Sequence, residues 1–125
     1  MKRHLAILLS SISPDAPHRC AAPFMHAAAA AAMDTEVEIH FSGPSVNLLR
    51  RGVADALPSG PRGRETVAAF MQHALEHGAR FIACNTALTE HDLSPGDLIE
   101  APVALAGAAA FVARALDEDW TTLVY

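Results

Sequence analysis

The sequence predicts an α/β protein in which about five mostly parallel strands form one sheet with helices on both faces, in a single domain over residues 1–125. Short apolar runs alternate along the chain with longer segments whose apolar residues recur at helical spacing. Clusters of proline, glycine and serine close several of these runs. Because alternating strands and helices call for right-handed crossovers, parallel pairing follows. A chain of 125 residues suits one hydrophobic core.

The first strand and the first long helix are expected before residue 34. Leu5–Leu9 is a short, continuous apolar run that the Ser10–Pro14 cluster closes, which is typical of a buried parallel strand. A helix is expected from Asp15, a residue suited to capping, to Met33. Its two adjacent apolar stripes make a broad surface, which indicates a helix covered by more than its own sheet.

A second strand and a loop are expected next. Thr35–Phe41 nearly alternates polar and apolar residues and contains β-branched side chains, so it is predicted to be a strand. The turn at Ser42–Ser45 can start a short helix that ends at Leu49. Leu57–Gly63 is rich in proline and glycine and is predicted to be a loop.

The second half of the chain repeats the pattern of helix and strand. Apolar residues between Val67 and Leu75 share one helical face, and Gly78 is placed to end that helix. Ala79–Ala83 is the third predicted strand, and a polar segment with a helical turn follows it. Ser94 then provides an N-cap, with proline at the first helical position.

The last three elements are expected to be a strand, a helix and a strand. Ala101–Leu105 and Thr121–Tyr125 are the predicted strands, and Gly107–Leu116 is the helix between them. The spacing of its apolar residues predicts that the helix turns these side chains inward: Phe111, Val112, Ala115 and Leu116.

The amino-acid composition excludes some classes of protein and favours self-association. The chain is 51% apolar with a net charge of −5 and no basic cluster, which argues against disorder and against nucleic-acid binding. Much of the apolar content is alanine, including the run Ala27–Ala32, and alanine buries little surface. We therefore expect a homo-oligomer, and we expect the alanine-rich first helix to be covered by a subunit contact.

Two further observations bear on location. Cys20 and Cys84 do not form the dense pattern of a secreted disulfide scaffold, so a reducing compartment is expected. Leu5–Leu9 is too short for a secretory signal, and no apolar run approaches the length of a membrane span. The expected location is cytoplasmic, with no membrane partner.

A site is expected where the carboxyl ends of the strands converge. Cys84 ends the third predicted strand, and neighbouring N–H groups together with the start of a helix favour a thiolate over a thiol. Candidates to hold an anion there come from the residues after Cys84 and from other strand ends: Asn85, Thr86, Ala87, Ser11 and Ser42. Strands also end in cysteine for packing alone, so position leaves both interpretations of Cys84 open.

The order of segments resembles the DsrE/DsrF-like sulfur-relay family, to which TusD also belongs. Five stretches carry this resemblance: "HLAILLSS", "AAPFMHAAAAAAMDTEVEIHFSGPSVNLL", "HGARFIACNTAL", "LSPGDLIEAPVALAGAAAFV" and "DEDWTTLVY". The resemblance implies flavodoxin-like layering, assembly into trimers or hexamers, and no metal or organic cofactor. It also implies that Cys84 matches the cysteine that carries sulfur as a persulfide.

Three hypotheses for function follow. The first is a sulfur carrier that accepts sulfane sulfur on Cys84 from a donor protein and passes it to an acceptor protein. The second is a non-catalytic oligomeric binding module in which Cys84 is structural. The third, a thiol peroxidase, lacks the usual local arginine, since only Thr86 stands near the thiol.

The other histidines and the second cysteine are expected to have mainly structural or surface roles. His91 lies in the loop after Cys84 and is a weak candidate for a base or charge partner. His73 and His77 have ligand spacing but fall on a solvated helix face without a third ligand, so no metal is expected. Cys20 is expected to be a small buried side chain. The sequence has neither a GxSxG nucleophile elbow nor a GxGxxG dinucleotide signature.

Overall fold

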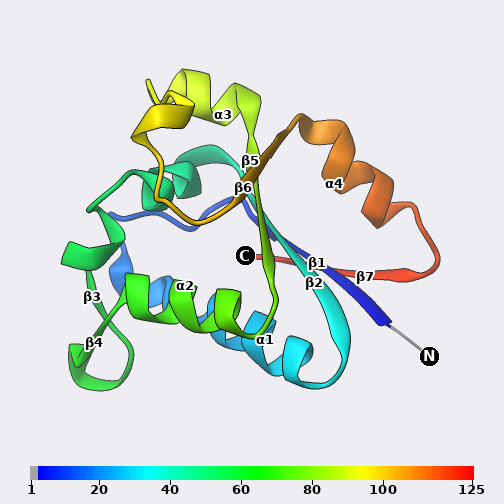
Figure 1. The fold of residues 1–125 in the computed structure, drawn as a ribbon, viewed down its shortest axis with the longest axis horizontal. Coiled ribbons are helices and arrows are strands. Elements are labelled where there is room, and N and C mark those ends of the chain that lie inside the picture. Colours follow the sequence, from blue (N-terminus) through cyan, green and yellow to red (C-terminus); the bar gives the residue numbers. More distant parts are fainter. Residues whose placement is uncertain (1–2) are drawn as a thin grey trace.

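A five-stranded parallel sheet forms the centre of the protein (Figure 1), as seen in a computed structural model that describes residues 3–125. Its order is β6-β5-β2-β1-β7, and every neighbouring pair is parallel. The strands have these bounds: β1 (Arg3–Leu9), β2 (Thr35–Phe41), β5 (Arg80–Cys84), β6 (Val103–Ala106) and β7 (Trp120–Val124). The predicted fold class is confirmed.

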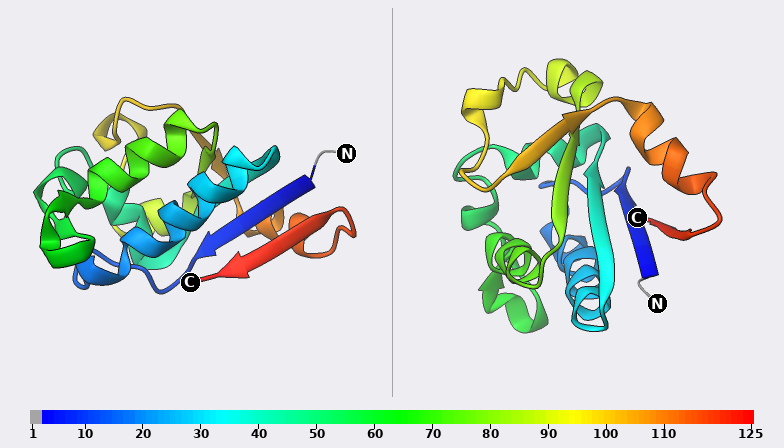
Figure 2. Two further views of the ribbon diagram at one scale, coloured as in Figure 1. Left: turned by 90° about the horizontal axis from the view of Figure 1, so that it is seen from below. Right: turned by 45° about the vertical axis from the view of Figure 1, so that its right-hand side comes forward.

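The main hydrophobic core lies between the sheet and the helices α1 (Ala21–Ala32) and α2 (Val67–Glu76), which cover one face of the sheet (Figure 2). Alternate residues of the three central strands point into it: Leu5, Ile7, Leu9, Val37, Ile39, Phe41 and Phe81. The ring of Phe24 on α1 lies with its centroid 6.0 Å from those of both Phe41 and Phe81. This aromatic cluster joins α1 to the two strands that lead to the candidate site.

Within residues 3–125, α4 (Ala108–Ala115) is the helix on the opposite face, where it lies against polar residues of the sheet. Because side chains alternate along a strand, Glu38 and His40 face this side while Ile39 faces the main core. Both are nevertheless buried, with exposed fractions of 2% and 5%. The prediction of helices on both faces is confirmed, but the two faces differ in chemistry.

The predicted inward face of α4 is confirmed for Phe111 and wrong for Val112, Ala115 and Leu116. Leu116 is 81% exposed and Val112 is 50% exposed, whereas Phe111 and Arg114 turn toward the sheet. The spacing of the apolar residues predicted an apolar contact between this helix and the sheet. The sheet instead presents the Glu38 carboxylate, which accepts hydrogen bonds from Arg114. The helix is therefore rotated to place a cation inward.

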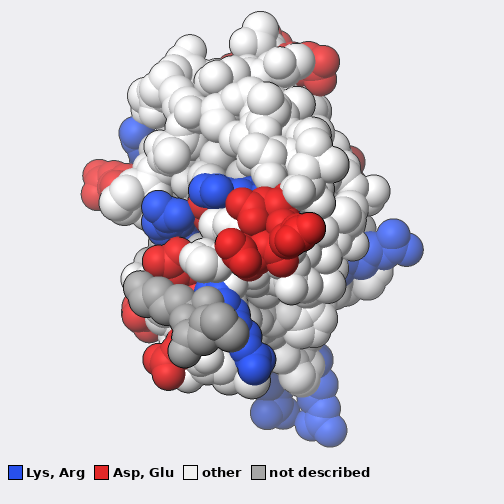
Figure 3. Space-filling view, turned by 90° about the vertical axis from the view of Figure 1, so that its right-hand side faces the viewer, with Lys and Arg blue, Asp and Glu red and all other residues white. Residues whose placement is uncertain are grey.

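Figure 3 looks onto the side of the molecule that carries α4 and β7. Acidic side chains gather in the middle of this view, and the area directly above them is uncharged, with further acidic atoms at the upper right edge. The turn between α4 and β7 contains three exposed acidic residues, Asp117–Asp119. Large apolar side chains are exposed on β6, α4 and β7: Leu105, Val112, Leu116, Leu123 and Val124.

The first helix starts later than predicted. A 3₁₀ turn occupies Pro17–Arg19, and α1 begins only at Ala21 instead of Asp15. Pro23 explains the delay, because a proline inside a helix lacks the required N–H and clashes with the preceding turn. In the first turn of α1 the missing N–H costs nothing. The predicted end near Met33 is confirmed, since Met33 is the C-cap.

The predicted loop at Leu57–Gly63 contains regular structure. A short strand, β3 (Pro58–Ser59), pairs antiparallel with β4 (Glu65–Thr66). Ser59 is buried, and its hydroxyl donates to the carbonyl of Pro17 at 2.7 Å, which ties this hairpin to the 3₁₀ turn before α1.

Several smaller boundaries also move. The strand predicted at Ala101–Leu105 starts at Val103, because Pro102 has no N–H for the ladder. The short helix expected to end at Leu49 is a 3₁₀ helix over Gly43–Leu49, and further 3₁₀ turns occupy Ala54–Ala56, Pro61–Gly63 and Pro95–Asp97. Within residues 3–125, no helix has the length and apolar character needed to cross a membrane.

Candidate functional site

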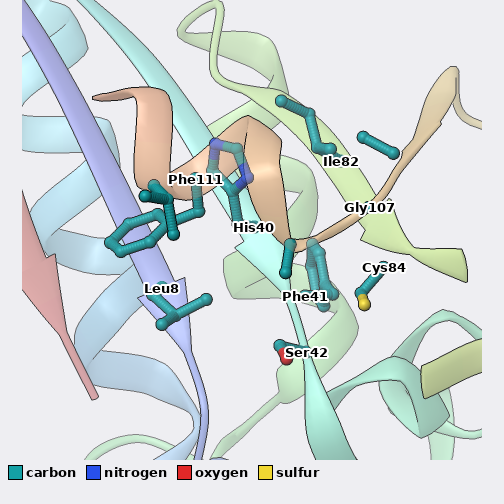
Figure 4. Close-up of a pocket in the computed structure, with 11 residues that line it drawn as sticks. Leu8, His40, Phe41, Ser42, Ile82, Cys84, Gly107 and Phe111 are labelled. Carbon is teal, nitrogen blue, oxygen red and sulfur yellow. The ribbon is translucent and has the colours of Figure 1, made fainter. Parts of the chain in front are cut away.

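A cavity of about 160 Å³ opens at the carboxyl ends of four strands, beside the first two turns of α4 (Figure 4). Its wall combines apolar side chains with one thiol, one hydroxyl and one imidazole. The lining residues are Leu8, His40, Phe41, Ser42, Ile82, Cys84, Ala106, Gly107, Ala108, Phe111 and Val112. This is the edge of a parallel sheet where binding sites form.

Cys84 is the cysteine that reaches this cavity. It is the last residue of β5 and the N-cap of α3 (Asn85–Glu90), and its side chain is half-buried. Within residues 3–125 no hydrogen bond to its Sγ atom is found. The strand ladder therefore fixes the position of the thiol, while its sulfur stays free to react.

Cys20 has the opposite environment. It is fully buried beneath the start of α1, and its thiol donates to the carbonyl of Ser13 at 3.4 Å. Burial raises the pKa of the Cys20 thiol, and the backbone contact only partly offsets this. The expectation of a small buried side chain is confirmed.

Of the two predicted serines, the fold brings one to Cys84. Ser42 directly follows β2 and lines the cavity. Gly43 permits the close turn after it, since its φ of +54° favours glycine and an added Cβ would lie 3.1 Å from the Ser10 carbonyl. Ser11 does not line the cavity, and its N–H donates to the carbonyl of Tyr125 instead.

The residues after Cys84 form a helix and leave the cavity wall. Asn85, Thr86 and Ala87 make the first turn of α3, and none of them lines the cavity. His91, at the other end of α3, accepts a hydrogen bond at Nδ1 from the Asn47 side chain at 3.2 Å. The structure therefore does not bring His91 to the thiol.

Sequence inspection missed a buried charged cluster next to the cavity. Glu38 accepts hydrogen bonds at its two carboxylate oxygens from Arg80 Nη2 at 2.8 Å, Arg114 Nη2 at 2.9 Å and Arg114 Nε at 3.1 Å. His40 Nε2 lies 3.0 Å from the same carboxylate. Figure 4 shows the His40 ring on the cavity side of β2. A signal existed, because "EIH" places two ionisable residues on one face of a central strand.

The cluster shifts the ionisation of its members. Burial raises the pKa of the Glu38 carboxyl, but hydrogen bonds and charge from Arg114 and His40 outweigh it, so the pKa lies below its ordinary value. Burial lowers the pKa of His40, and the hydrogen bond to Glu38 offsets this only in part. The Glu38 contact raises the pKa of Arg114. Glu38 is therefore an anion and His40 a neutral imidazole near pH 7.

The cavity can hold a small apolar or weakly polar group against a thiol. Leu8, Ile82 and Val112 make part of the wall apolar, while Cys84 offers a nucleophile and His40 an ionisable group. Among residues 3–125, no three histidine, cysteine, aspartate or glutamate side chains are grouped to bind a metal ion.

The chain was compared with protein families and with solved structures. The model of the DsrE/DsrF-like family matches residues 4–123. A search of curated proteins finds no match. The YchN protein of E. coli superposes with a TM-score of 0.75 at 13% identity, over 100% of both chains.

Two further solved structures share the fold. MTH1491 from Methanobacterium thermoautotrophicum, a protein of unknown function, has a TM-score of 0.72 at 16% identity over 98% of this chain and 99% of its own. BT1422 from Bacteroides thetaiotaomicron, also of unknown function, has a TM-score of 0.68 at 14% identity over 98% and 94%. At these identities the structures establish a shared architecture and no more.

Proposed function

Because the chain belongs to the DsrE/DsrF-like family, we propose that it is a sulfur carrier that holds sulfane sulfur as a persulfide on Cys84. The observation that carries this proposal is the half-buried Cys84 thiol in the wall of the cavity at the carboxyl ends of the strands. A carrier needs a thiol that is accessible to a partner's sulfur and yet shielded from bulk solvent. Members of this family generally act in sulfur relay.

Sulfur transfer through Cys84 needs partner proteins and no metal or organic cofactor. A donor protein presents a persulfide, and an acceptor thiol later removes the sulfur from Cys84 by the same exchange chemistry. The cavity of about 160 Å³ suits the end of a persulfide side chain better than a whole metabolite. Such exchange fits a reducing, cytoplasmic location.

Loss of the thiol should abolish sulfur loading. After incubation with a sulfane sulfur donor, the wild-type protein is expected to gain about 32 Da per sulfur atom as a persulfide. Cys84→Ser should show no such adduct by intact mass spectrometry, since a hydroxyl cannot accept the sulfur. Cys20→Ser should load like the wild type, because Cys20 is fully buried. No adduct on the wild type, or an equal adduct on Cys84→Ser, contradicts the proposal.

The hypothesis of a non-catalytic binding module makes a different prediction for the Cys84 thiol. If Cys84 only packs the strand end, Cys84→Ala leaves partner or anion binding unchanged and the wild-type thiol takes up no sulfur. A thiol peroxidase would instead consume hydrogen peroxide in a Cys84-dependent manner. Peroxide consumption is expected to be negligible, because within residues 3–125 no arginine lines the cavity, and Arg80 and Arg114 both bind Glu38.

Self-association is the second part of the proposal, and two surfaces compete for it. The alanine-rich α1 was expected to be covered, and α2 already packs along one side of it, leaving Met25 50% exposed. Met33 at the end of α1 is 69% exposed, but more of the exposed apolar side chains lie around α4 and β7, where Leu116 is 81% and Val124 is 62% exposed. We assign the subunit contact to the surface of α4 and β7, because monomers rarely leave such a group exposed.

A charge placed on that surface should shift the oligomeric state. Leu116→Glu is expected to convert the oligomer to smaller species in sedimentation velocity, because an unpaired carboxylate is costly to bury. Met25→Glu serves as the matched control on α1 and should leave the oligomer intact. The reverse result would move the contact to α1. A wild-type protein that is monomeric at all concentrations would end this part of the proposal.

A further inference from the structure

His40 and Cys84 face the same cavity from neighbouring strands. His40 of β2 is in register with Ile82 of β5, and Cys84 lies two residues farther along β5. Since residues two apart in a strand share a face, the imidazole and the thiol stand on the same side of the sheet. Figure 4 shows both side chains on the cavity side, and both belong to its wall.

Glu38 determines which nitrogen of His40 carries the proton. The Glu38 carboxylate receives three hydrogen bonds from arginine side chains and is ionised, so it can only accept. The contact of 3.0 Å between His40 Nε2 and Glu38 Oε1 therefore requires a hydrogen on Nε2. In the neutral ring, Nδ1 is then left with a free lone pair. Within residues 3–125, Nδ1 makes no hydrogen bond.

The surroundings keep His40 in this basic form. His40 is 5% exposed and its ring meets the edge of Phe111 at a centroid distance of 5.4 Å. The ionisable groups around it are Glu38 on its own strand, Arg80 and Cys84 on β5, and Arg114 on α4; β1 contributes only Leu8 to the cavity wall. Burial lowers its pKa, which keeps the ring neutral at pH 7.

On these observations, and resting on the proposed role of Cys84, we propose that His40 Nδ1 is the proton acceptor for sulfur transfer and that Glu38 positions it. The Cys84 thiol gives its proton to Nδ1 through water held in the cavity that both side chains line, and the thiolate attacks the outer sulfur of a hydropersulfide R–S–SH. A bond forms between Sγ and that sulfur as the donor's S–S bond breaks. The electron pair leaves on the donor sulfur, which takes the proton back from His40.

The net reaction converts Cys84–SH and R–S–SH into Cys84–S–SH and R–SH, with no outside oxidant or reductant. The apolar part of the wall, formed by Leu8, Ile82 and Val112, disfavours a charged group. The site therefore takes the neutral hydropersulfide in preference to its anion. The substrate class is an uncharged persulfide end presented by a partner.

The test compares wild type, His40→Asn and His91→Gln across a pH series. Asparagine keeps a polar group near the Nδ1 position but cannot take up the proton. Two rates are measured between about pH 5 and pH 10: sulfur uptake from glutathione hydropersulfide by mass spectrometry, and alkylation of Cys84 by iodoacetamide. Cys20→Ser serves as the background for all variants, so that only Cys84 reports.

At pH 6.5 to 7, His40→Asn is expected to lower both rates about 10- to 100-fold. Near pH 10 the variants should converge, since the thiol then ionises without help. His91→Gln should match the wild type throughout, because His91 is held by Asn47. A purely structural role for His40 would lower the rates equally at every pH.

The outcomes separate this inference from the proposed function. Identical pH profiles for His40→Asn and wild type, with normal sulfur uptake, overturn the role of His40 and leave the carrier intact. No uptake by the wild type overturns the carrier, and the alkylation series still decides whether His40 serves the thiol. Circular dichroism verifies that each variant is folded, and His40→Gln provides a second variant if asparagine disrupts the strand.

Discussion

Replacing Glu38 with glutamine is expected to destabilise the fold by about 2–3 kcal/mol, as measured by urea denaturation. The carboxylate is 2% exposed and receives four hydrogen bonds from three basic side chains. The glutamine NH₂ group would face donors, which leaves buried polar groups unsatisfied. The loss of stability should stay below the roughly 3–5 kcal/mol that breaking a fully buried ion pair costs, because the Arg80 side chain is 65% exposed and can be solvated instead.

The substitution should also change how stability depends on pH. The pKa of Glu38 is lowered in the folded state, so its stabilising contribution is fully present above pH 4.5 and is lost as the pH falls through the folded value. Glu38→Gln should lack this acid-sensitive component. Hydrogen exchange should accelerate in α4, since Arg114 ties that helix to the sheet.

Glu36→Gln is the matched control for this prediction. Glu36 lies two residues earlier on the same face of β2, and its side chain is 44% exposed with one carboxylate oxygen 3.1 Å from His4 Nε2. An exposed pair of this kind contributes under about 1 kcal/mol. Equal losses for the two variants would show that burial of the Glu38 carboxylate carries no special weight.

The sequence was sufficient to predict the sheet and the position of Cys84 within it. The continuous apolar run Leu5–Leu9 correctly predicted a buried parallel strand, and Ala79–Ala83 correctly predicted the third strand to within one residue. Ser42 and Cys84 could be brought together in advance, since both follow the carboxyl ends of strands. These inferences depend only on local pattern and on the rules of parallel sheets.

Beyond the Glu38–His40 pair, the Glu38 cluster could not be predicted, because the two arginines reach Glu38 only through the fold of the chain. Glu38, Arg80 and Arg114 are separated by up to 76 positions along the chain, and local periodicity says nothing about such pairs. On a strand that nearly alternates polar and apolar residues, nothing local distinguishes a buried Glu38 and His40 from solvated ones. The same oversight placed Leu116 inward, since helix periodicity assumes that the facing surface is apolar.

The two faces of the sheet should respond unequally to loss of an aromatic ring. Phe24→Ala is expected to cost about 4 kcal/mol in thermal or urea unfolding. Phe24 is fully buried between Phe41 and Phe81, and its neighbours on α1, Ala27 and Ala28, are too short to fill the resulting cavity.

Phe111→Ala on the opposite face provides the comparison. Phe111 is half-buried and contacts the His40 ring at the cavity, so its loss should cost only about 1–2 kcal/mol while opening the site to solvent. The rate of Cys84 alkylation should therefore change more in Phe111→Ala than in Phe24→Ala, although Phe24→Ala should lose more stability. Equal destabilisation by the two variants would mean that α4 belongs to the main core. A smaller loss for Phe111→Ala would mean that α4 packs on the sheet through few apolar contacts, and its outer surface would stay available to a second subunit.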